Sequence, residues 1–163
     1  MSKIKLSILL LIKISLVSCT SNIGSYNYKT SVAYVGGEYD GLVLSNQLKS
    51  HLNNFGMFDK NSEYEIQANI SHTQDLYITN IDNTSDRERV DSSLNVNIFN
   101  KELNCITYSN SETVSQFYVL ALSDQFISNN TAVEEIKIKN TEYLVKKFVN
   151  SLSEEKLVCD EQK

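Results

Sequence analysis

The chain has 163 residues, 20 of them acidic and 15 basic, with no proline, no tryptophan and nine tyrosines. Three of the basic residues, Lys3, Lys5 and Lys13, lie in the first 18 positions, so the remainder carries a net charge of about −8. That negative net charge excludes non-specific binding to nucleic acid. The length after residue 18 suits one domain with a real core and is too short for two.

Residues 1–18 have the pattern of an export signal. Lys3 and Lys5 precede an apolar run from Ile8 to Val17 that only Lys13 and Ser15 interrupt. Such a run is too short to cross the ~30 Å hydrocarbon core of a bilayer as a stable anchor. The sequence therefore predicts a signal peptide over residues 1–18.

Cys19 stands where the apolar run stops, and the stretch LVSC, residues 16–19, resembles the bacterial lipobox. The resemblance implies diacylglycerol transfer to the Cys19 thiol, cleavage before it and acylation of the new amino terminus, which together make a lasting membrane anchor. Thr20 occupies the place where an acidic residue retains such lipoproteins in the inner membrane, so we expect the outer membrane, on its periplasmic side. The alternative is a plain secretory signal with a chance cysteine. Residues 19–30 are polar and are expected to form the lipidated tether.

Two further cysteines, Cys105 and Cys159, remain in a protein that is expected to enter an oxidising compartment. They either form a disulfide between a strand and the C-terminal tail, or one is buried in a strand and the other lies in a loose tail. Sequence does not show whether their Cα atoms lie within bridging distance, so both interpretations stay open.

The first half of the domain is expected to hold a strand and a helix. SVAYVGG, residues 31–37, is typical of a short strand ended by a glycine pair. Leu44, Leu48, Leu52 and Phe55 then recur at helical spacing, which predicts a helix from Asp40 to Phe55 that Gly56 ends.

Three long strands are expected next. Residues 64–78 alternate between apolar and polar side chains, residues 80–89 (NIDNTSDRER) favour a hairpin loop, and alternation resumes from Val90 to Ile98. A fourth strand is expected from Ile106 to Leu122, with a bulge near residues 110–113.

The last element is predicted to be an amphipathic helix. Thr131 and Glu134 have the spacing of a capping box, and apolar residues at helical spacing continue to a stop near Ser153. Asn140 interrupts the apolar stripe and is interpreted as a register or edge position rather than a ligand. Residues 154–163 are expected to be a flexible tail.

These elements predict an α+β two-layer sandwich over residues 31–153, with two helices on one face of a four-stranded, mainly antiparallel sheet in the order β-α-β-β-β-α. Both helices need the sheet to bury their apolar faces.

The sequence contains no recognisable motif for metal binding, phosphate binding or nucleophilic catalysis. His51 and His72 lack the compact ligand spacing of a metal site, the glycine pair at 36 and 37 lacks the lysine of a phosphate loop, and no G-x-S-x-G elbow occurs. We therefore expect a protein that is not an enzyme and that uses no cofactor and no metal.

The two arginines of the chain, Arg87 and Arg89, stand close together, and every other basic residue is a lysine or a histidine. Because a guanidinium binds phosphate or carboxylate with two parallel hydrogen bonds, this pair points to an anionic partner. The alternative is a solvated hairpin whose arginines pair with Asp86, Glu88 and Asp91.

Taken together, the chain resembles the LPS-assembly lipoprotein family, LptE, also called RlpB, over residues 19–153. The stretches that carry the resemblance are LVSC, LSNQLKSHLNNFG, YEIQANISHTQDLYITNIDNTSDRERVDSSLNVNIF and EYLVKKFVNSL, and their order and lengths carry more of it than any single residue does.

The resemblance implies a plug inside an LptD-type outer-membrane β-barrel, which the lipoprotein helps to assemble while it assists lipopolysaccharide on its way to the outer leaflet. It also implies that Arg87 and Arg89 contact lipopolysaccharide phosphates. The family's second contact, a lysine before the last helix, has no match, because residues 123–130 contain no basic residue. The alternative function is a periplasmic lipoprotein that serves an ABC-type lipid transporter or binds a small ligand.

Overall fold

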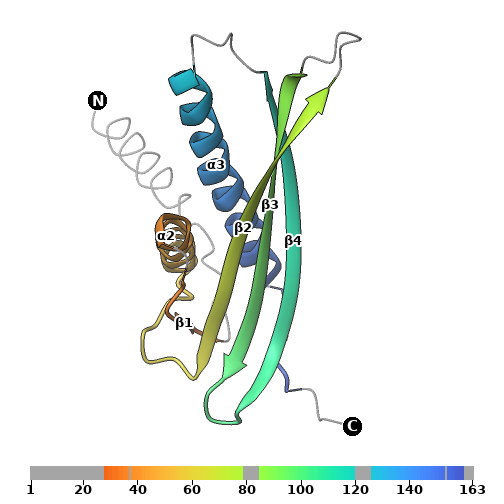
Figure 1. Cartoon of the computed structure of the whole chain (residues 1–163). Coiled ribbons are helices and arrows are strands. Elements are labelled where there is room, and N and C mark those ends of the chain that lie inside the picture. Colours follow the sequence, from red (N-terminus) through yellow and green to blue (C-terminus); the bar gives the residue numbers. More distant parts are fainter. Residues whose placement is uncertain (1–27, 37, 79–84, 120–125, 153, 160–163) are drawn as a thin grey trace, which may run out of the picture.

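The computed structural model describes residues 28–36, 38–78, 85–119, 126–152 and 154–159. Its elements follow in the order β1 (Thr30–Val32), α2 (Glu38–Asn54), β2 (Tyr64–Ile78), β3 (Ser85–Asn100), β4 (Cys105–Val119) and α3 (Phe126–Leu152). The strands form one sheet in the spatial order β1-β2-β3-β4, in which β1 runs parallel to β2 and the other pairs are antiparallel. Figure 1 shows both helices on one face of the sheet, with α3 running along the strands. The predicted fold class is confirmed.

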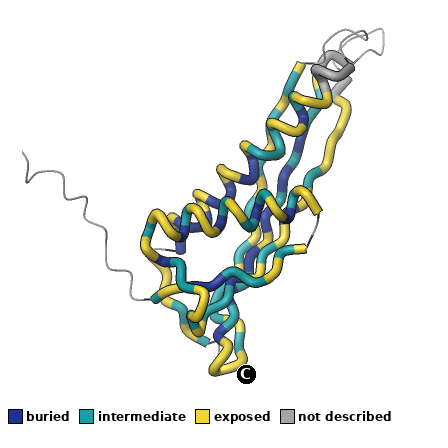
Figure 2. Tube along the Cα trace, turned by 90° about the vertical axis from the view of Figure 1, so that its left-hand side faces the viewer, coloured by how far each residue is buried: buried dark blue, intermediate teal, exposed yellow. Residues whose placement is uncertain are grey.

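The core lies between the two helices and the inner face of the sheet. Leu44, Leu48 and Leu52 of α2 are completely buried, and each such side chain contributes about 1.5–3 kcal/mol relative to exposure. The remaining core residues are Met57, Ile66, Ile70, Leu94, Val96, Ile98, Leu144, Val145, Phe148, Val149 and Leu152. Figure 2 shows the buried positions concentrated where the helices meet the strands. Among the described residues, no helix has the length and apolar character to cross a membrane.

Gly56 ends α2 as predicted, and it does so through a specific hydrogen-bond pattern. Its φ of 68° is in the left-handed region that favours glycine. The Gly56 N–H donates to the Asn53 carbonyl at 3.0 Å, and the Met57 N–H donates to the Leu52 carbonyl at 2.8 Å. This pair of bonds is the Schellman motif, which satisfies carbonyls that the helix end leaves without partners.

The start of α2 depends on Gly41. A Cβ at this position would lie 2.2 Å from the Gly36 carbonyl oxygen, so α2 approaches the backbone after β1 more closely than any side chain permits. The strand predicted over residues 31–37 is shorter in the structure, where β1 ends at Val32.

Two predicted boundaries were wrong. β3 begins at Ser85 rather than Val90, because its charged first residues pair with both β2 and β4. The last helix begins at Phe126 rather than at the Thr131 cap. Thr, Ser and Asn inside a helix cost less than about 0.7 kcal/mol each relative to Ala, so a capping motif does not oblige a helix to start there.

The fourth strand also differs from its prediction. The pairing of β3 with β4 shifts between Ile98 and Phe99, opposite Ile106–Tyr108, so the irregularity is not at residues 110–113. β4 ends at Val119, and the predicted continuation to Leu122 lies outside the described residues.

Both ends of the described chain are fastened to the domain. The Tyr28 hydroxyl donates to the Leu152 carbonyl at the end of α3, and Thr30 already belongs to β1, although both positions fall within the expected tether. Cys105 and Cys159 form a disulfide with their Cα atoms 5.9 Å apart. Of the two interpretations that the sequence left open, the disulfide is the one that the structure contains.

Candidate functional site

The residues singled out from the sequence have different outcomes. Cys19 and the signal peptide lie outside the described residues, as does the first half of the predicted hairpin loop, residues 80–84. Arg87 and Arg89 are not loop residues, because both lie near the start of strand β3. The arginines therefore have the fixed spacing of a strand, with their Cα atoms two positions apart on the same face.

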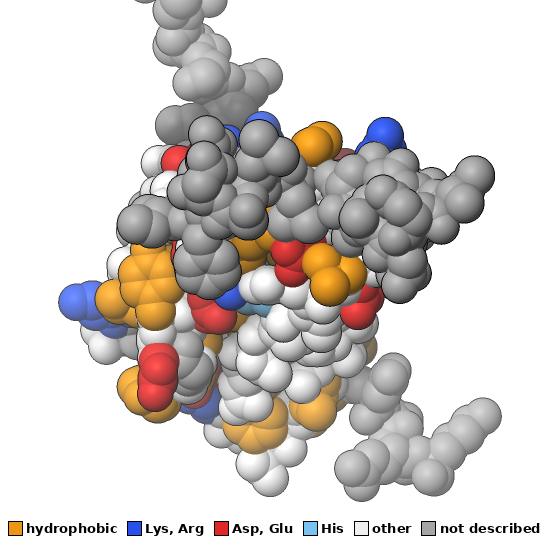
Figure 3. All heavy atoms as spheres, turned by 45° about the horizontal axis from the view of Figure 1, so that its top comes forward, with side chains coloured by type: hydrophobic (Ala, Val, Ile, Leu, Met, Phe, Trp, Pro, Cys, Tyr) orange, Lys and Arg blue, Asp and Glu red, His pale blue; other side chains and the backbone are white. Residues whose placement is uncertain are grey.

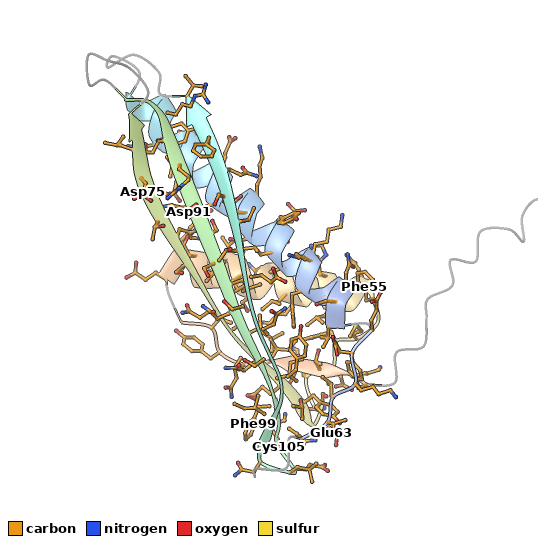
Figure 4. The ribbon with its side chains drawn as sticks, turned by 90° about the vertical axis from the view of Figure 1, so that its right-hand side faces the viewer. Phe55, Glu63, Asp75, Asp91, Phe99 and Cys105 are labelled. Atoms are coloured by element: carbon orange, nitrogen blue, oxygen red, sulfur yellow. A yellow bond between two sulfur atoms is a disulfide. The ribbon has the colours of Figure 1, made fainter. Side chains whose placement is uncertain are left out.

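The face that carries them is the one that the helices leave uncovered, and we call it the open face (Figure 4). The odd-numbered residues of β2 and β3 point to it, and the even-numbered residues of β3, such as Val90 and Leu94, are buried under the helices. In the register of the sheet, Arg89 lies between Asp75 on β2 and Phe117 on β4, and Arg87 lies opposite Val119.

Arg89 is held between two carboxylates. One guanidinium nitrogen of Arg89 donates to Asp75 Oδ2 at 2.9 Å, and its Nε lies 2.9 Å from Asp91 Oδ2. The hydrogen bond to Asp75 and the charge of Asp91 raise the pKa of Arg89 above its ordinary value. Asp91 in turn accepts a hydrogen bond from the Ser115 hydroxyl. Asp75 and Asp91 lie on neighbouring strands toward the same end of the sheet (Figure 4).

The sequence anticipated half of this arrangement. The interpretation of a solvated pair named Asp91 as a partner, and Asp91 does contact Arg89. Asp75 was missed because it lies on another strand, 14 positions earlier, and only the register of β2 against β3 brings it opposite Arg89. The signal that could have found it is the strand alternation itself, which puts Asp75 on the polar face of β2.

Large apolar side chains are exposed at the same end of the sheet. Leu76 is 66% exposed, Phe117 53% and Val119 72%. Figure 3, viewed toward this end, shows hydrophobic side chains beside acidic and basic ones at the surface. Cationic and apolar groups side by side suit a ligand that has both an anionic group and a hydrocarbon part.

On the opposite face of the same strands, Glu88 and Tyr118 form a pair. The Tyr118 hydroxyl donates to a Glu88 carboxylate oxygen. Partial burial, together with this hydrogen bond to Glu88, raises the pKa of Tyr118 well above its ordinary value. The phenol therefore remains a hydrogen-bond donor across the physiological range and helps to fix the start of β3 against the end of β4.

A shallow depression of about 350 Å³ lies in the open face next to the Arg89 cluster. Apart from Arg89, Asp91 and Ser92, whose hydroxyl lies on the buried face of the sheet, its lining consists of hydroxyl side chains, namely Ser71, Thr73, Ser93, Thr113 and Ser115. Such a surface offers hydrogen bonds to a polar partner, since each hydroxyl both donates and accepts.

The two histidines belong to different environments. His72 Nδ1 lies 2.8 Å from Ser92 Oγ, under the helices. His51 is half-buried in the last turn of α2. In the part of the chain that the structure describes, no group of three or more His, Cys, Asp or Glu side chains is placed to hold a metal ion.

No family model and no curated protein matches the chain. Solved structures do match its fold. A minor lipoprotein from Acinetobacter baumannii aligns with a TM-score of 0.61 and 17% identity over 83% of this chain and 98% of its own. Lipoprotein B from Nitrosomonas europaea aligns with a TM-score of 0.57 and 13% identity over 77% of this chain and 82% of its own.

The rare lipoprotein B from Shewanella oneidensis aligns with a TM-score of 0.53 and 7% identity over 78% of this chain and 96% of its own. At these identities the likeness concerns the fold. The chain therefore has the two-layer fold of these solved bacterial lipoproteins, over 82% or more of each of them.

Proposed function

We propose that this protein is a lipoprotein of the outer membrane, anchored through Cys19, that plugs and helps to assemble an LptD-type β-barrel and assists lipopolysaccharide on its way to the outer leaflet. No catalytic step, cofactor or metal is part of this role. The observation that carries the proposal is the combination of the LVSC stretch at residues 16–19 with a fold shared by lipoproteins that include a rare lipoprotein B.

Two features of the surface support the proposal. A plug needs a polar surface, because the lumen of a large barrel is wet and its lipid contacts are on the outside. The open face supplies one, with Ser, Thr and Asn side chains over most of its length. At one end of that face, exposed Arg87 lies opposite exposed Val119, the pairing of charge and hydrocarbon that a phosphorylated, acylated lipid requires.

The two arginines differ in their exposure and in their neighbours. Arg89 already contacts Asp75 and Asp91, so a phosphate at its guanidinium must compete with two carboxylates. Arg87 is the more exposed of the two, and we assign to it the first contact with an anionic lipid. Arg89 has a positioning role beside it.

Co-purification from solubilised outer membranes tests the proposal. The full-length chain, tagged after Lys163, is extracted in mild detergent and its partners are identified by mass spectrometry. We expect a large barrel in near-equal amount. Recovery of the protein alone, or with subunits of an inner-membrane ABC transporter, would overturn the proposal and favour the accessory-lipoprotein function. A Cys19→Ser variant is the matched control for the anchor.

A further inference from the structure

The middle of the open face carries an unusual set of side chains. Three successive rows across β2, β3 and β4 hold amide and hydroxyl groups and no charge. These residues, which we call the amide–hydroxyl patch, are Gln67, Asn69, Ser71, Ser93, Asn95, Asn97, Ser109, Ser111 and Thr113. The six on the outer strands β2 and β4 are exposed, and of the three on the central strand β3 only Asn95 is exposed.

The opposite side of the domain has the reverse composition. The exposed side of α3 is dominated by ionised residues, namely Glu134, Glu135, Lys139, Glu142, Lys146 and Lys147. The two outer surfaces of the same domain, one sheet face and one helix face, therefore differ in what it costs to remove them from water. Charged groups cost several kcal/mol each to desolvate, whereas a hydroxyl or amide that finds a new hydrogen bond costs little.

We propose that the amide–hydroxyl patch is the surface by which the domain lies against the inner wall of its partner barrel. This inference rests on the proposed function and adds to it the side of the domain that makes the contact. Ser, Thr and Asn side chains lose little rotamer freedom and offer adaptable hydrogen bonding, the property that makes Ser and Asn frequent in antibody combining sites.

Apolar side chains lie at both ends of the patch on the same face. Ile106, opposite Phe99, is 53% exposed at one end, and Phe117, opposite Arg89, is 53% exposed at the other. A hydrogen-bonding centre with apolar residues beside it has the composition of an interface that is formed for binding, since burial of those side chains adds a favourable term.

The size of the face favours an enclosing partner over a second copy of this chain. From the row of Glu65 to the row of Tyr77, the face is about 40 Å long and three strands, about 14 Å, wide, or roughly 550 Å². A stable dimer interface buries about 800 Å² on each partner. A concave barrel wall buries additional surface beyond this face, because it also contacts the outer edge of β4. In the described sheet, no other strand covers that edge.

Site-specific photocrosslinking in cells tests the assignment. A benzoylphenylalanine is placed at Ser111 in the patch, and at Lys139 on α3 as the control position, each in the tagged full-length chain. We expect an adduct with the barrel from position 111 and at least tenfold less from position 139. Barrel that co-purifies but crosslinks equally or preferentially from position 139 overturns this inference and leaves the proposed function standing.

Two other outcomes also decide. Adducts at twice the mass of the chain from position 111 overturn the choice of occupant in favour of a second copy. Absence of the barrel from the purified material overturns the proposed function itself and, with it, this inference.

A charge inserted into the patch gives a second, independent test. Asn95→Lys places an ammonium in the centre of the patch, and Asn54→Lys places the same change at the exposed end of α2. We expect at least tenfold less barrel recovered with Asn95→Lys and no change with Asn54→Lys, with both variants melting at the wild-type temperature. Equal recovery of barrel with the two folded variants contradicts the inference.

Discussion

Asn140 on α3 donates a hydrogen bond from Nδ2 to Ser92 Oγ on β3 at 2.9 Å, and both side chains are buried. Ser92 Oγ also lies 2.8 Å from His72 Nδ1 on β2, so a chain of three polar groups connects the helix to two strands. The interruption in the apolar stripe is thus a register position, as the sequence indicated, and it lies in the interior rather than at an edge. A slip of α3 by one turn, about 5.4 Å, breaks this chain.

Ser92→Ala should destabilise the domain by about 1–3 kcal/mol, because Asn140 and His72 both lose a partner inside the core. Ser93→Ala, on the open face, is the control and should change stability by less than about 0.5 kcal/mol. Urea unfolding measures both. Adding Asn140→Leu to Ser92→Ala should recover part of the loss, since an apolar side chain then replaces an unsatisfied amide. Equal stability of the two alanine variants would refute a structural role for the chain of polar groups.

Stability should fall as the pH is lowered past the ordinary pKa of histidine, 6.5. Burial lowers the pKa of His72, and nearby Lys137 adds to this effect, while Asp40 and Glu134 oppose it. The unfolded chain therefore binds the proton more readily, so the contribution of His72 is complete above 6.5 and is lost as the pH falls through the lower, folded-state pKa. The urea midpoint at about pH 7.5 and about pH 5 measures this. His72→Gln should show a smaller difference, and an unchanged difference would assign the effect to other groups.

Loss of the disulfide should have a larger effect than any single surface change. Cys105 and Cys159 are 54 positions apart, and closing a loop of that length in the unfolded chain corresponds to about 4 kcal/mol. Reductant should lower the unfolding midpoint of the wild type to that of the Cys105→Ser/Cys159→Ser variant. The variant itself should not respond to reductant. A wild type that is equally stable with and without reductant would contradict the prediction.

Gly41→Ala should destabilise the domain by about 1–3 kcal/mol, because its methyl group would overlap the Gly36 carbonyl oxygen. Gly36→Ala is a matched control, since a Cβ at Gly36 meets nothing within 4 Å. Thermal melts of the two variants measure the contrast. If Gly41→Ala melts no lower than Gly36→Ala, the first turn of α2 can move away from β1 without cost.

Arg87→Ala should weaken binding to lipid A by about tenfold or more, because a charge-assisted hydrogen bond contributes about 1.5–3 kcal/mol. Arg89→Ala should have a smaller effect, since Asp75 and Asp91 already hold that side chain. Both effects are measured by titrating lipid A into the purified protein and following the binding by calorimetry or by the fluorescence of an attached label. The Arg87→Ala loss should disappear with dephosphorylated lipid A. Equal losses for the two lipids would remove the arginines from phosphate recognition.

Much of the fold could be predicted because burial leaves a period in the sequence. Leu44, Leu48 and Leu52 recur every four residues and all three are buried, and Gly56 stops the helix at the predicted place. The first residues of β3 could not be assigned, because Ser85–Arg89 is polar on both faces and alternation is invisible without apolar residues. The start of α3 was missed because the cap motif at Thr131 predicted a later start, and a capping pattern does not prevent a helix from beginning upstream of it.

The candidate site was less predictable than the fold. Composition alone showed that Arg87 and Arg89 were exceptional, but the Asp75 contact depends on strand register and the disulfide depends on a distance in space. The amide–hydroxyl patch is spread over 47 positions of sequence, from Gln67 to Thr113, so no local motif announces it.

The hydrogen bond of Tyr28 to the end of α3 limits how far the domain can lie from its lipid anchor. With Cys19 as the lipid anchor, as proposed, nine residues separate the membrane surface from the first fixed point of the domain, at most about 30 Å of extended chain. Tyr28 contacts Tyr64 at the start of β2, and Arg87 lies opposite Tyr77, some 13 residues further along, or about 43 Å. The tether and the arginines are therefore at opposite ends of the domain, so the length of the sheet sets the separation between Tyr28 and Arg87.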